Sequence, residues 1–213
     1  MEDRELDALH ERGRAVSFEA GERLLHEGEP GDKVVLILSG RVKVSHAGSD
    51  GRETILDFRG PGELVGELSA LDEGPRSSSV TAIEPVDALL VPAADFGVLL
   101  DRPGFATALL RMLSIRFRDA DRKRLEFGGS DTVGRAAARL VELAERYGEP
   151  EAEGIVIALP ISQDELAGWT AASRAGMANA LRTLRELGWI ETERRRITVR
   201  DLEALRARAS VQN

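Results

Sequence analysis

The chain has 213 residues, of which 42% are hydrophobic, and this is enough for one large domain or two small ones with a packed core. It contains no cysteine, which excludes disulfide scaffolds, thiolate zinc sites, iron–sulfur clusters and cysteine nucleophiles. The net charge of −8 argues against a nucleic-acid partner for the chain as a whole, but residues 159–200 carry seven arginines against five acidic residues. We therefore expect contact with DNA only in the C-terminal third.

The N-terminal segment, MEDRELDALHERG, is charged and lacks the apolar core of a secretory signal. Elsewhere in the sequence, apolar runs stay well below the roughly 18 residues that cross a bilayer. We expect a cytoplasmic protein that makes no contact with a membrane.

Residues 1–104 have the pattern of a β domain. Short apolar runs of β type at 33–40, 41–46 and 53–58 are separated by turns that contain glycine, proline or aspartate. Closely spaced strands of this kind predict an antiparallel β-roll or jelly-roll sandwich.

Residues 105–130 form the next segment, and their pattern predicts one long helix. Its side chains follow a heptad spacing that is typical of a helical dimer seam, at Leu110, Leu113, Phe117, Ala120, Arg124 and Phe127. The same stripe could instead pack on the β-roll of its own chain in a monomer. The sequence GGS at 128–130 breaks the helix and provides a hinge between domains.

Residues 131–213 predict a third segment of short helices and strands. Asp131 or Thr132 caps a helix that ends at Gly148, the acidic residues 149–154 form a surface loop, and 155–160 form a short strand. Ser162 and Glu165 have the spacing of a capping box. Together the three segments predict an α+β chain.

The C-terminal segment then continues as a winged helix-turn-helix. A helix from Ser162 to Trp169, a short turn at 170–173 and a helix capped by Ser173 come in that order, followed by two strands within 189–199. The second helix places Met177 and its apolar neighbours on one face and polar side chains on the other. An amphipathic helix of an enzyme's accessory domain is the alternative.

Arginine and amide side chains on the polar face suit contact with duplex DNA. Arg174 can bond O6 and N7 of guanine, and Asn179 can read adenine or touch phosphate. Side chains and backbone amides at helix starts commonly contact phosphate, and the arginines at 194–196 can lie along the DNA backbone. The predicted DNA-binding residues are Ser162, Gln163, Ser173, Arg174, Asn179, Arg182, Arg195 and Arg196.

The stretch GELVGELSALDEGPRSSSV at 62–80 predicts a nucleotide site. Gly66 permits close backbone approach, and the planar fork of Arg76 matches a phosphate bidentately with the hydroxyl of Ser77 beside it. The carboxylate of Glu67 suits a ribose 2′-hydroxyl. An ion pair between Glu67 and Arg76 that merely closes a loop is the structural alternative.

These motifs resemble those of the cyclic-AMP receptor protein and fumarate–nitrate regulator family of bacterial transcription factors, over nearly the whole chain. The resemblance implies a β-roll sensor, a homodimer formed through the long helix, ligand-controlled binding to an inverted repeat in duplex DNA, and contact with RNA polymerase. It also implies that Glu67 holds the ribose of cyclic AMP and that Arg76 and Ser77 hold its phosphate. The remaining pocket positions near this motif are Gly66, Leu68 and Ser78.

The sequence departs from this family at the position of the base. Alignment through Gly134 and Arg135 places Ala120 and Asp121 where cyclic-AMP members have Thr and Ser on the long helix. Ala120 cannot bond a base, whereas Asp121 can accept from the adenine amino group or from N1 and N2 of guanine. Asp121 can equally be solvated or paired with an arginine, so cyclic GMP stays open as a ligand.

The recognition helix departs too. The chain reads Ser173-Arg174-Ala175, with Asn179 downstream, where family members often have Ser-Arg-Glu and a downstream arginine. The usual half-site sequence therefore does not transfer. Ala171 occupies a turn position that often holds glycine.

Two other functions compete with this interpretation. The first keeps DNA binding but makes the sensor ligand-independent or specific for another molecule. The second is a metal-dependent β-roll enzyme, which we reject because His46 lacks the neighbouring histidines that a metal site needs. We also expect no haem, since His10, His26 and His46 are the only histidines.

Overall fold

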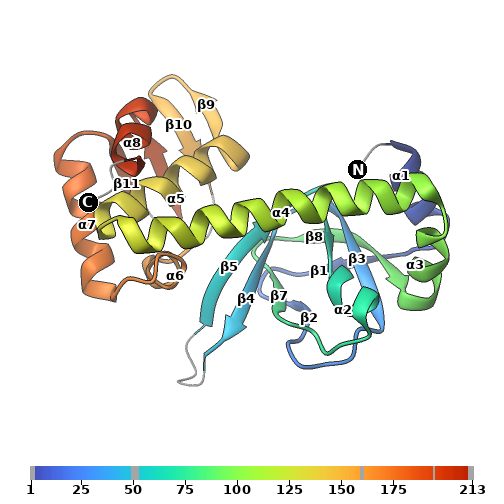
Figure 1. The fold of residues 1–213 in the computed structure, drawn as a ribbon. Coiled ribbons are helices and arrows are strands. Elements are labelled where there is room, and N and C mark those ends of the chain that lie inside the picture. Colours follow the sequence, from blue (N-terminus) through green and yellow to red (C-terminus); the bar gives the residue numbers. More distant parts are fainter. Residues whose placement is uncertain (1–2, 49–52, 159–160, 194, 211–213) are drawn as a thin grey trace. The chain divides into compact units, whose positions relative to one another are not determined.

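The computed structural model describes residues 3–48, 53–158, 161–193 and 195–210, and the side chains of 126–129 lie outside this description. Arg194 and the side chain of Phe127 are therefore not described. The chain divides into two compact units, Met1–Asp119 and Ala120–Asn213. The division falls within the long helix α4 (Pro103–Gly129), which Figure 1 shows as one continuous ribbon.

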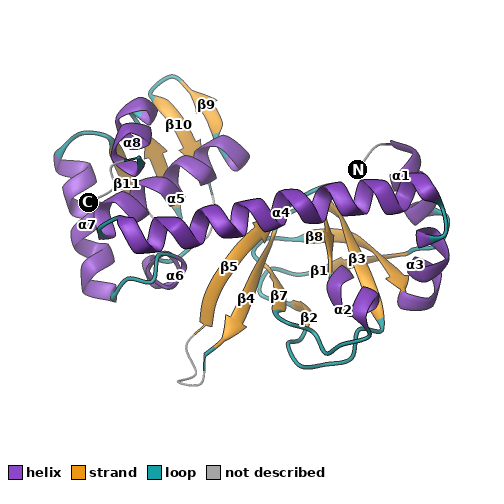
Figure 2. Ribbon diagram, viewed as in Figure 1, coloured by secondary structure: helices purple, strands orange, loops and turns teal. Residues whose placement is uncertain are grey.

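Unit 1 contains two four-stranded antiparallel sheets. An antiparallel β domain is what the sequence predicted for this part of the chain (Figure 2). Their strand orders are β1-β8-β3-β6 and β2-β7-β4-β5. The strands are β1 (Arg14–Phe18), β2 (Arg23–Leu25), β3 (Lys33–Ser39), β4 (Val42–Ala47), β5 (Glu53–Arg59), β6 (Leu64–Val65), β7 (Ser79–Ala82) and β8 (Val86–Pro92).

Strand β3 explains why the sequence has an unbroken apolar run there. Successive side chains of a strand point to opposite faces, and in β3 both faces are covered. Val35 and Ile37 belong to a core cluster that draws on both sheets, while Val34 and Leu36 belong to a second cluster that includes helical residues. Unit 1 is therefore built around two apolar layers.

Three further helices accompany the sheets of unit 1: α1 (Asp3–His10), α2 (Glu67–Asp72) and α3 (Ala93–Leu100). Phe96 of α3 meets Phe105 of α4 edge to face, with ring centroids 5.6 Å apart. The sequence analysis predicted neither α1 nor α3, because each has only eight residues, which is too short for a clear helical period.

The predicted seam on α4 is divided between two surroundings within unit 1. Leu113 packs against the core cluster of its own unit. Leu110 and Phe117, which are one heptad apart, are 65% and 68% exposed. The helix thus buries one face against its own unit and leaves an apolar stripe on another.

Unit 2 has the predicted winged helix-turn-helix with one additional strand and one additional helix. A four-stranded sheet has the order β11-β12-β10-β9. The elements are α5 (Thr132–Tyr147), β9 (Glu149–Glu151), β10 (Gly154–Ile157), α6 (Gln163–Trp169), α7 (Arg174–Glu186), β11 (Ile190–Glu193), β12 (Arg196–Val199) and α8 (Leu202–Ala209).

The prediction of a surface loop at 149–154 is wrong. Residues 149–151 form the edge strand β9, which pairs with β10 in the register Ile155↔Pro150 and Val156↔Glu149. Exposed acidic residues hid the strand, because an edge strand needs few apolar side chains of its own. Proline is tolerated there for the same reason.

The helix starts of unit 2 confirm the predicted caps. Asp131 accepts a hydrogen bond from the Gly134 amide, and Ser162 and Glu165 form both bonds of a capping box. Ser173 accepts from the Gly176 amide at the start of α7. Ala171, in the turn between α6 and α7, adopts a left-handed φ of 47°, which agrees with its assignment to a glycine-type position.

Candidate functional site

The glycine of the 62–80 stretch is required by its surroundings. Gly66 follows β6 and has a φ of 81°, which an L-residue adopts at a cost. A Cβ atom at this position would lie 2.6 Å from Nη1 of Arg76 and 2.7 Å from Cδ1 of Leu25. The absence of a side chain therefore lets the arginine pack directly against the backbone at the start of α2.

Arg76 is a buried cation held by several acceptors. Its Nη2 donates to Oδ1 of Asp32 at 3.0 Å and to the carbonyl of Lys33 at 2.9 Å, and its Nη1 donates to Oγ of Ser69 at 3.3 Å. The residue is 4% exposed. Its backbone amide donates to the carbonyl of Glu29 at 2.8 Å, so both the chain and the guanidinium are fixed.

The counterion of Arg76 lies at the surface. Burial acts to raise the pKa of Asp32, but the hydrogen bond from Arg76 and the charges of Lys33 and Arg76 outweigh it and keep the pKa below 3.8. The Asp32 side chain is nevertheless 65% exposed. A buried cation with an exposed carboxylate as its partner is suited to exchange that partner for an incoming anion.

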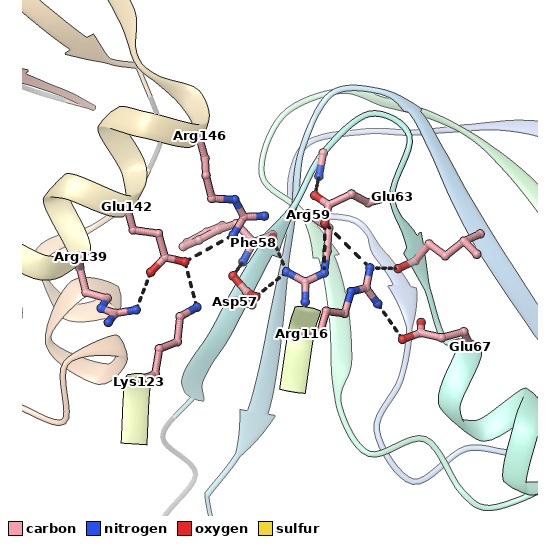
Figure 3. A network of polar contacts seen from close by, with 12 residues as sticks. Asp57, Phe58, Arg59, Glu63, Glu67, Arg116, Lys123, Arg139, Glu142 and Arg146 are labelled. Atoms are coloured by element: carbon pink, nitrogen blue, oxygen red, sulfur yellow. Dashed lines mark hydrogen bonds and ion pairs between the residues drawn. The ribbon is translucent and has the colours of Figure 1, made fainter. Parts of the chain in front are cut away.

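Glu67 is also buried, and its partner is a residue that the sequence analysis missed. Arg116 of α4 donates from Nη1 to Oε1 of Glu67 at 2.7 Å and from Nη2 to the carbonyl of Leu64 at 2.8 Å (Figure 3). Since Glu67 pairs with Arg116 and Arg76 pairs with Asp32, the alternative of a Glu67–Arg76 ion pair is wrong. No pattern in the sequence links Glu67 and Arg116, because they are 49 positions apart.

Neighbouring charges surround the Glu67–Arg116 pair. Burial lowers the pKa of Arg116, the charge of Glu67 acts to raise it, and the charge of Arg59 acts to lower it. Glu63 lies 3.8 Å from Nη2 of Arg116, and Arg59 lies 2.5 Å from Asp57 (Figure 3). The cluster thus combines both signs of charge around one buried carboxylate.

The other predicted ligand residues have different degrees of exposure. Leu68 lies on α2 and is 49% exposed. Ser77 is exposed and Ser78 half-buried, on the connection from Arg76 to β7. The sequence assigns these residues to the site, and their contact with a ligand stays a prediction.

Ala120 and Asp121 lie on the part of α4 that belongs to unit 2, and both are exposed. Their predicted contact with a nucleotide base likewise stays a prediction. In unit 2, Lys123 of α4 donates to Glu142 of α5 at 2.9 Å, and Arg139 and Arg146 contact the same carboxylate (Figure 3).

This carboxylate cluster lies beside the helix-turn-helix. Trp169, the last residue of α6, is buried, and Lys123 Nζ and Arg139 Cζ lie 5.5 and 5.4 Å from the centroid of its ring. Through Lys123, α4 therefore contacts α6, the helix that precedes the recognition helix. Sequence patterns gave no signal for this contact.

The exposed face of α7 carries the polar residues predicted to contact DNA. Arg174 donates to Asp164 at 2.5 Å, and Arg182 donates to Oδ1 of Asn179 at 2.5 Å. All four residues are exposed, whereas Met177 and Leu181 on the opposite face are buried. The recognition helix is therefore amphipathic in the sense that the sequence predicted.

The remaining predicted DNA contacts lie at the helix starts and in the wing. Ser162 and Gln163 are exposed at the start of α6, and Ser173 is exposed at the start of α7. Arg195 is exposed in the wing turn with a φ of 60°, and Arg196 contacts Glu151 at 2.7 Å. Each of these positions is accessible in unit 2.

Comparison with known proteins finds a match for each of the two domains. Residues 15–102 match the family model of a cyclic nucleotide-binding domain, and residues 134–208 match that of a Crp-like helix-turn-helix domain. A CRP-like cAMP-activated global transcriptional regulator of Mycobacterium tuberculosis is 36% identical over 98% of this chain and 94% of its own length. A cyclic AMP receptor protein of Thermus thermophilus is 30% identical over 88% of this chain and 84% of its own length.

A solved structure has the same architecture. A transcriptional regulator of the CRP/FNR family from Thermus thermophilus superposes with a TM-score of 0.79 and 26% identity, over 94% of this chain and all of that one. The chain therefore belongs to the CRP/FNR family, named after the cyclic-AMP receptor protein and the fumarate–nitrate regulator. It is a cyclic-nucleotide-binding, helix-turn-helix regulator of transcription and not an enzyme.

The comparisons thus confirm the predicted fold: an N-terminal β domain, a long helix and a C-terminal helix-turn-helix. Within the described part of the chain, none of the helices combines the length and the apolar character that a membrane span requires.

Proposed function

We propose that this chain is a homodimeric regulator that binds cyclic AMP at Arg76 and, in response, an inverted repeat in duplex DNA. The observation that carries the proposal is the buried guanidinium of Arg76, packed against Gly66 and paired with the exposed carboxylate of Asp32. A phosphodiester carries one negative charge and can replace that carboxylate.

The polar groups around Arg76 suit the other parts of a cyclic nucleotide. Glu67 uses Oε1 for its contact with Arg116, and its second carboxylate oxygen can accept a bond from the ribose 2′-hydroxyl. Ser77 and Ser78 would donate to phosphate oxygens, and Gly66 and Leu68 would line the pocket. Arg116 would then connect the ribose contact to α4.

Cyclic AMP is the first choice of ligand because the mycobacterial relative is named as activated by it. Cyclic GMP is the second, because Asp121 offers a carboxylate that can accept from N1 and N2 of guanine, while Ala120 offers only a methyl group. The two nucleotides share the phosphate and ribose that Arg76 and Glu67 would bind.

The exposed stripe on α4 supports dimerisation. Leu110 and Phe117 are exposed large apolar residues at a spacing of seven. Two copies joined through this helix would present two α7 helices to successive major grooves, about 34 Å apart. The partners would be duplex DNA and RNA polymerase, both in the cytoplasm.

Calorimetric titration with cyclic AMP and cyclic GMP tests the sensor. We expect the wild-type chain to bind, with Arg76→Ala losing binding at every accessible concentration. Arg41→Ala is the control, because it removes a guanidinium of the same unit that pairs with Glu84, and it should bind normally. If the wild-type chain binds neither nucleotide but still binds DNA, the ligand-independent or other-ligand sensor is correct instead.

Light scattering tests the dimer. The wild-type chain should have the mass of two copies at micromolar concentration, and Phe117→Asp should shift it toward one copy, because a charge would enter the apolar seam. A wild-type monomer under these conditions would contradict the proposed assembly.

A further inference from the structure

The side chain of Arg174, at the start of the recognition helix, is held by a residue of the preceding helix. Its Nε lies 2.5 Å from Oδ1 of Asp164, and its Nη2 donates to Oδ2 at 2.5 Å. Both atoms of one guanidinium edge therefore face both oxygens of one carboxylate. Such bidentate pairs restrict the orientation of the guanidinium plane as well as its position.

The pair leaves a defined set of donors. A guanidinium has five N–H groups in a fixed planar fork, and Asp164 engages the edge formed by Nε and Nη2. The edge formed by Nη1 and Nη2 keeps two parallel N–H groups, and the Arg174 side chain is 80% exposed. That spacing matches O6 and N7 of guanine in the major groove.

The support of Asp164 is itself rigid. Asp164 lies in the first turn of α6, which Ser162 and Glu165 fix through the capping box. The following turn of α6 is anchored by Leu166 and Trp169, both buried. A carboxylate on such a helix determines where the arginine points better than the flexible arginine chain does alone.

The presence of Asp164 also has a cost for binding. A carboxylate beside the contact surface repels DNA phosphates, so it weakens binding to every duplex regardless of sequence. The exposed ion pair itself contributes little to stability, and Asp164 supports the fold mainly through its favourable place in the first turn of α6. That place in α6 does not require the bidentate contact with Arg174, and a role in discrimination between bases accounts for that contact.

From this pair we infer that Asp164 is a specificity-determining residue, which acts by positioning Arg174 to read guanine. The inference rests on the proposed function, because it assumes that Arg174 contacts DNA bases. Asp164 itself is a positioning residue.

The test uses the full-length chain with cyclic AMP and the duplex that the wild-type chain selects from a randomised pool. Fluorescence anisotropy measures affinity for that duplex, for versions with single guanine replacements in each half-site, and for unrelated duplex. The guanine whose replacement costs the wild-type chain most affinity is taken as the contact of Arg174. In Asp164→Asn we expect the preference for this guanine to fall about fivefold, which is within the discrimination that a bidentate contact provides. Affinity for unrelated duplex should stay the same or rise, because one negative charge is gone.

Two further variants complete the design. Glu186→Gln removes one negative charge from the exposed end of α7, the helix that carries Arg174, and should keep the full preference for guanine. Arg174→Lys keeps the positive charge but loses the fork, so it should lose the same preference. The double variant Arg174→Lys/Asp164→Asn should lose little more of the preference than either single variant, because both changes remove the same interaction.

Each outcome has a distinct meaning. If Asp164→Asn keeps the preference for guanine, or loses affinity for all duplexes equally, the inference is overturned while the proposed function stands. If the wild-type chain selects no duplex, the proposed function fails and the inference fails with it. A preference that is lost in Asp164→Asn and Arg174→Lys, but kept in Glu186→Gln, supports the inference.

Discussion

The predicted ligand site of unit 1 and the predicted DNA face of unit 2 use arginine in opposite ways. In unit 1, Arg76 is buried, and Arg116 reaches a glutamate that is itself buried. In unit 2, Arg174 and Arg196 are paired with acidic residues at the surface, where water also solvates them. In these pairs unit 1 fixes the geometry of its arginines, whereas the predicted DNA face of unit 2 keeps its arginines accessible for a partner. Away from that face, unit 2 also holds a buried arginine, Arg139, beside Trp169.

The same difference sets the energetic consequences of mutation. Removing one partner of a buried pair leaves an uncompensated charge, which is strongly destabilising. Removing one partner of an exposed pair changes stability little, because water replaces the contact. We therefore expect changes at the buried pairs of unit 1 to affect folding as well as ligand binding, and changes at the exposed pairs of unit 2 to affect mainly binding to DNA.

The largest effect on stability is expected for Arg116→Met. Glu67 would keep its buried position without a cation, and the free energy of unfolding of the full chain should fall by about 3–5 kcal/mol. Urea titration followed by circular dichroism measures this loss. The double variant Arg116→Met/Glu67→Gln should recover part of the stability, and a single variant as stable as wild type would contradict the buried-pair account.

Gly66→Ala should have the next largest effect. The change adds a Cβ where φ is 81° and where Arg76 Nη1 would be only 2.6 Å away, so it should cost about 1–2 kcal/mol of stability and weaken cyclic AMP binding at least about tenfold. Gly62→Ala is a matched control, because its φ is 78° and, apart from its chain neighbours, nothing lies within 4 Å of its Cβ position. Gly62→Ala should lose only the stability that the backbone strain costs and should bind cyclic AMP with normal affinity. Equal affinity losses in both variants would show that the contact with Arg76 is irrelevant.

Asp32→Asn sharpens the comparison in the sensor. The change removes the carboxylate that competes with a phosphate for Arg76, so calorimetry should show tighter binding of cyclic AMP, by about threefold to tenfold. Weaker binding would mean that Asp32 supports the ligand-bound arrangement instead.

The pH dependence of the Asp32 contact has a defined sign. The pKa of Asp32 in the folded chain lies below 3.8, so its contribution to stability is fully present above pH 3.8 and is lost as the pH falls through the folded pKa. The free energies of unfolding of wild type and Asp32→Asn should therefore become equal once the pH is below the folded pKa of Asp32. A difference in stability that is confined to pH 6–8 would show that ionised Asp32 is not its source.

The smallest effect on stability is expected for Arg196→Ala. Its pair with Glu151 is exposed, so the free energy of unfolding should change by less than about 0.5 kcal/mol. Binding to all duplexes should weaken uniformly, and the slope of log affinity against log salt should decrease by about 1. A selective loss for one base sequence would show that Arg196 reads bases and does not follow the backbone.

Local signals in the sequence were sufficient for most of the helix-turn-helix. Ser162, Glu165 and Ser173 determine helix starts through contacts within three residues, so their pattern is visible without a structure. The β-strand signals of unit 1 are equally local, because alternation and turn residues mark each strand.

Contacts between distant residues escaped prediction. Glu67 and Arg116 are 49 positions apart, and Asp32 and Arg76 are 44 positions apart, so no spacing rule connects them. The edge strand β9 was missed because its pairing with β10 comes from the partner strand and not from its own residues. The local motif at 62–80 therefore predicts where the site lies, while the ion pairs around it become visible only in the folded structure.

The central claim is that an anion bound at Arg76 controls the affinity of unit 2 for DNA. The most direct test measures affinity for the selected inverted repeat with and without cyclic AMP, in wild type, Arg76→Ala and the Arg41→Ala control. We predict that cyclic AMP strengthens binding at least about tenfold in wild type and in Arg41→Ala, and has no effect in Arg76→Ala. Equal affinity with and without cyclic AMP in wild type, or an undiminished response in Arg76→Ala, would contradict the account.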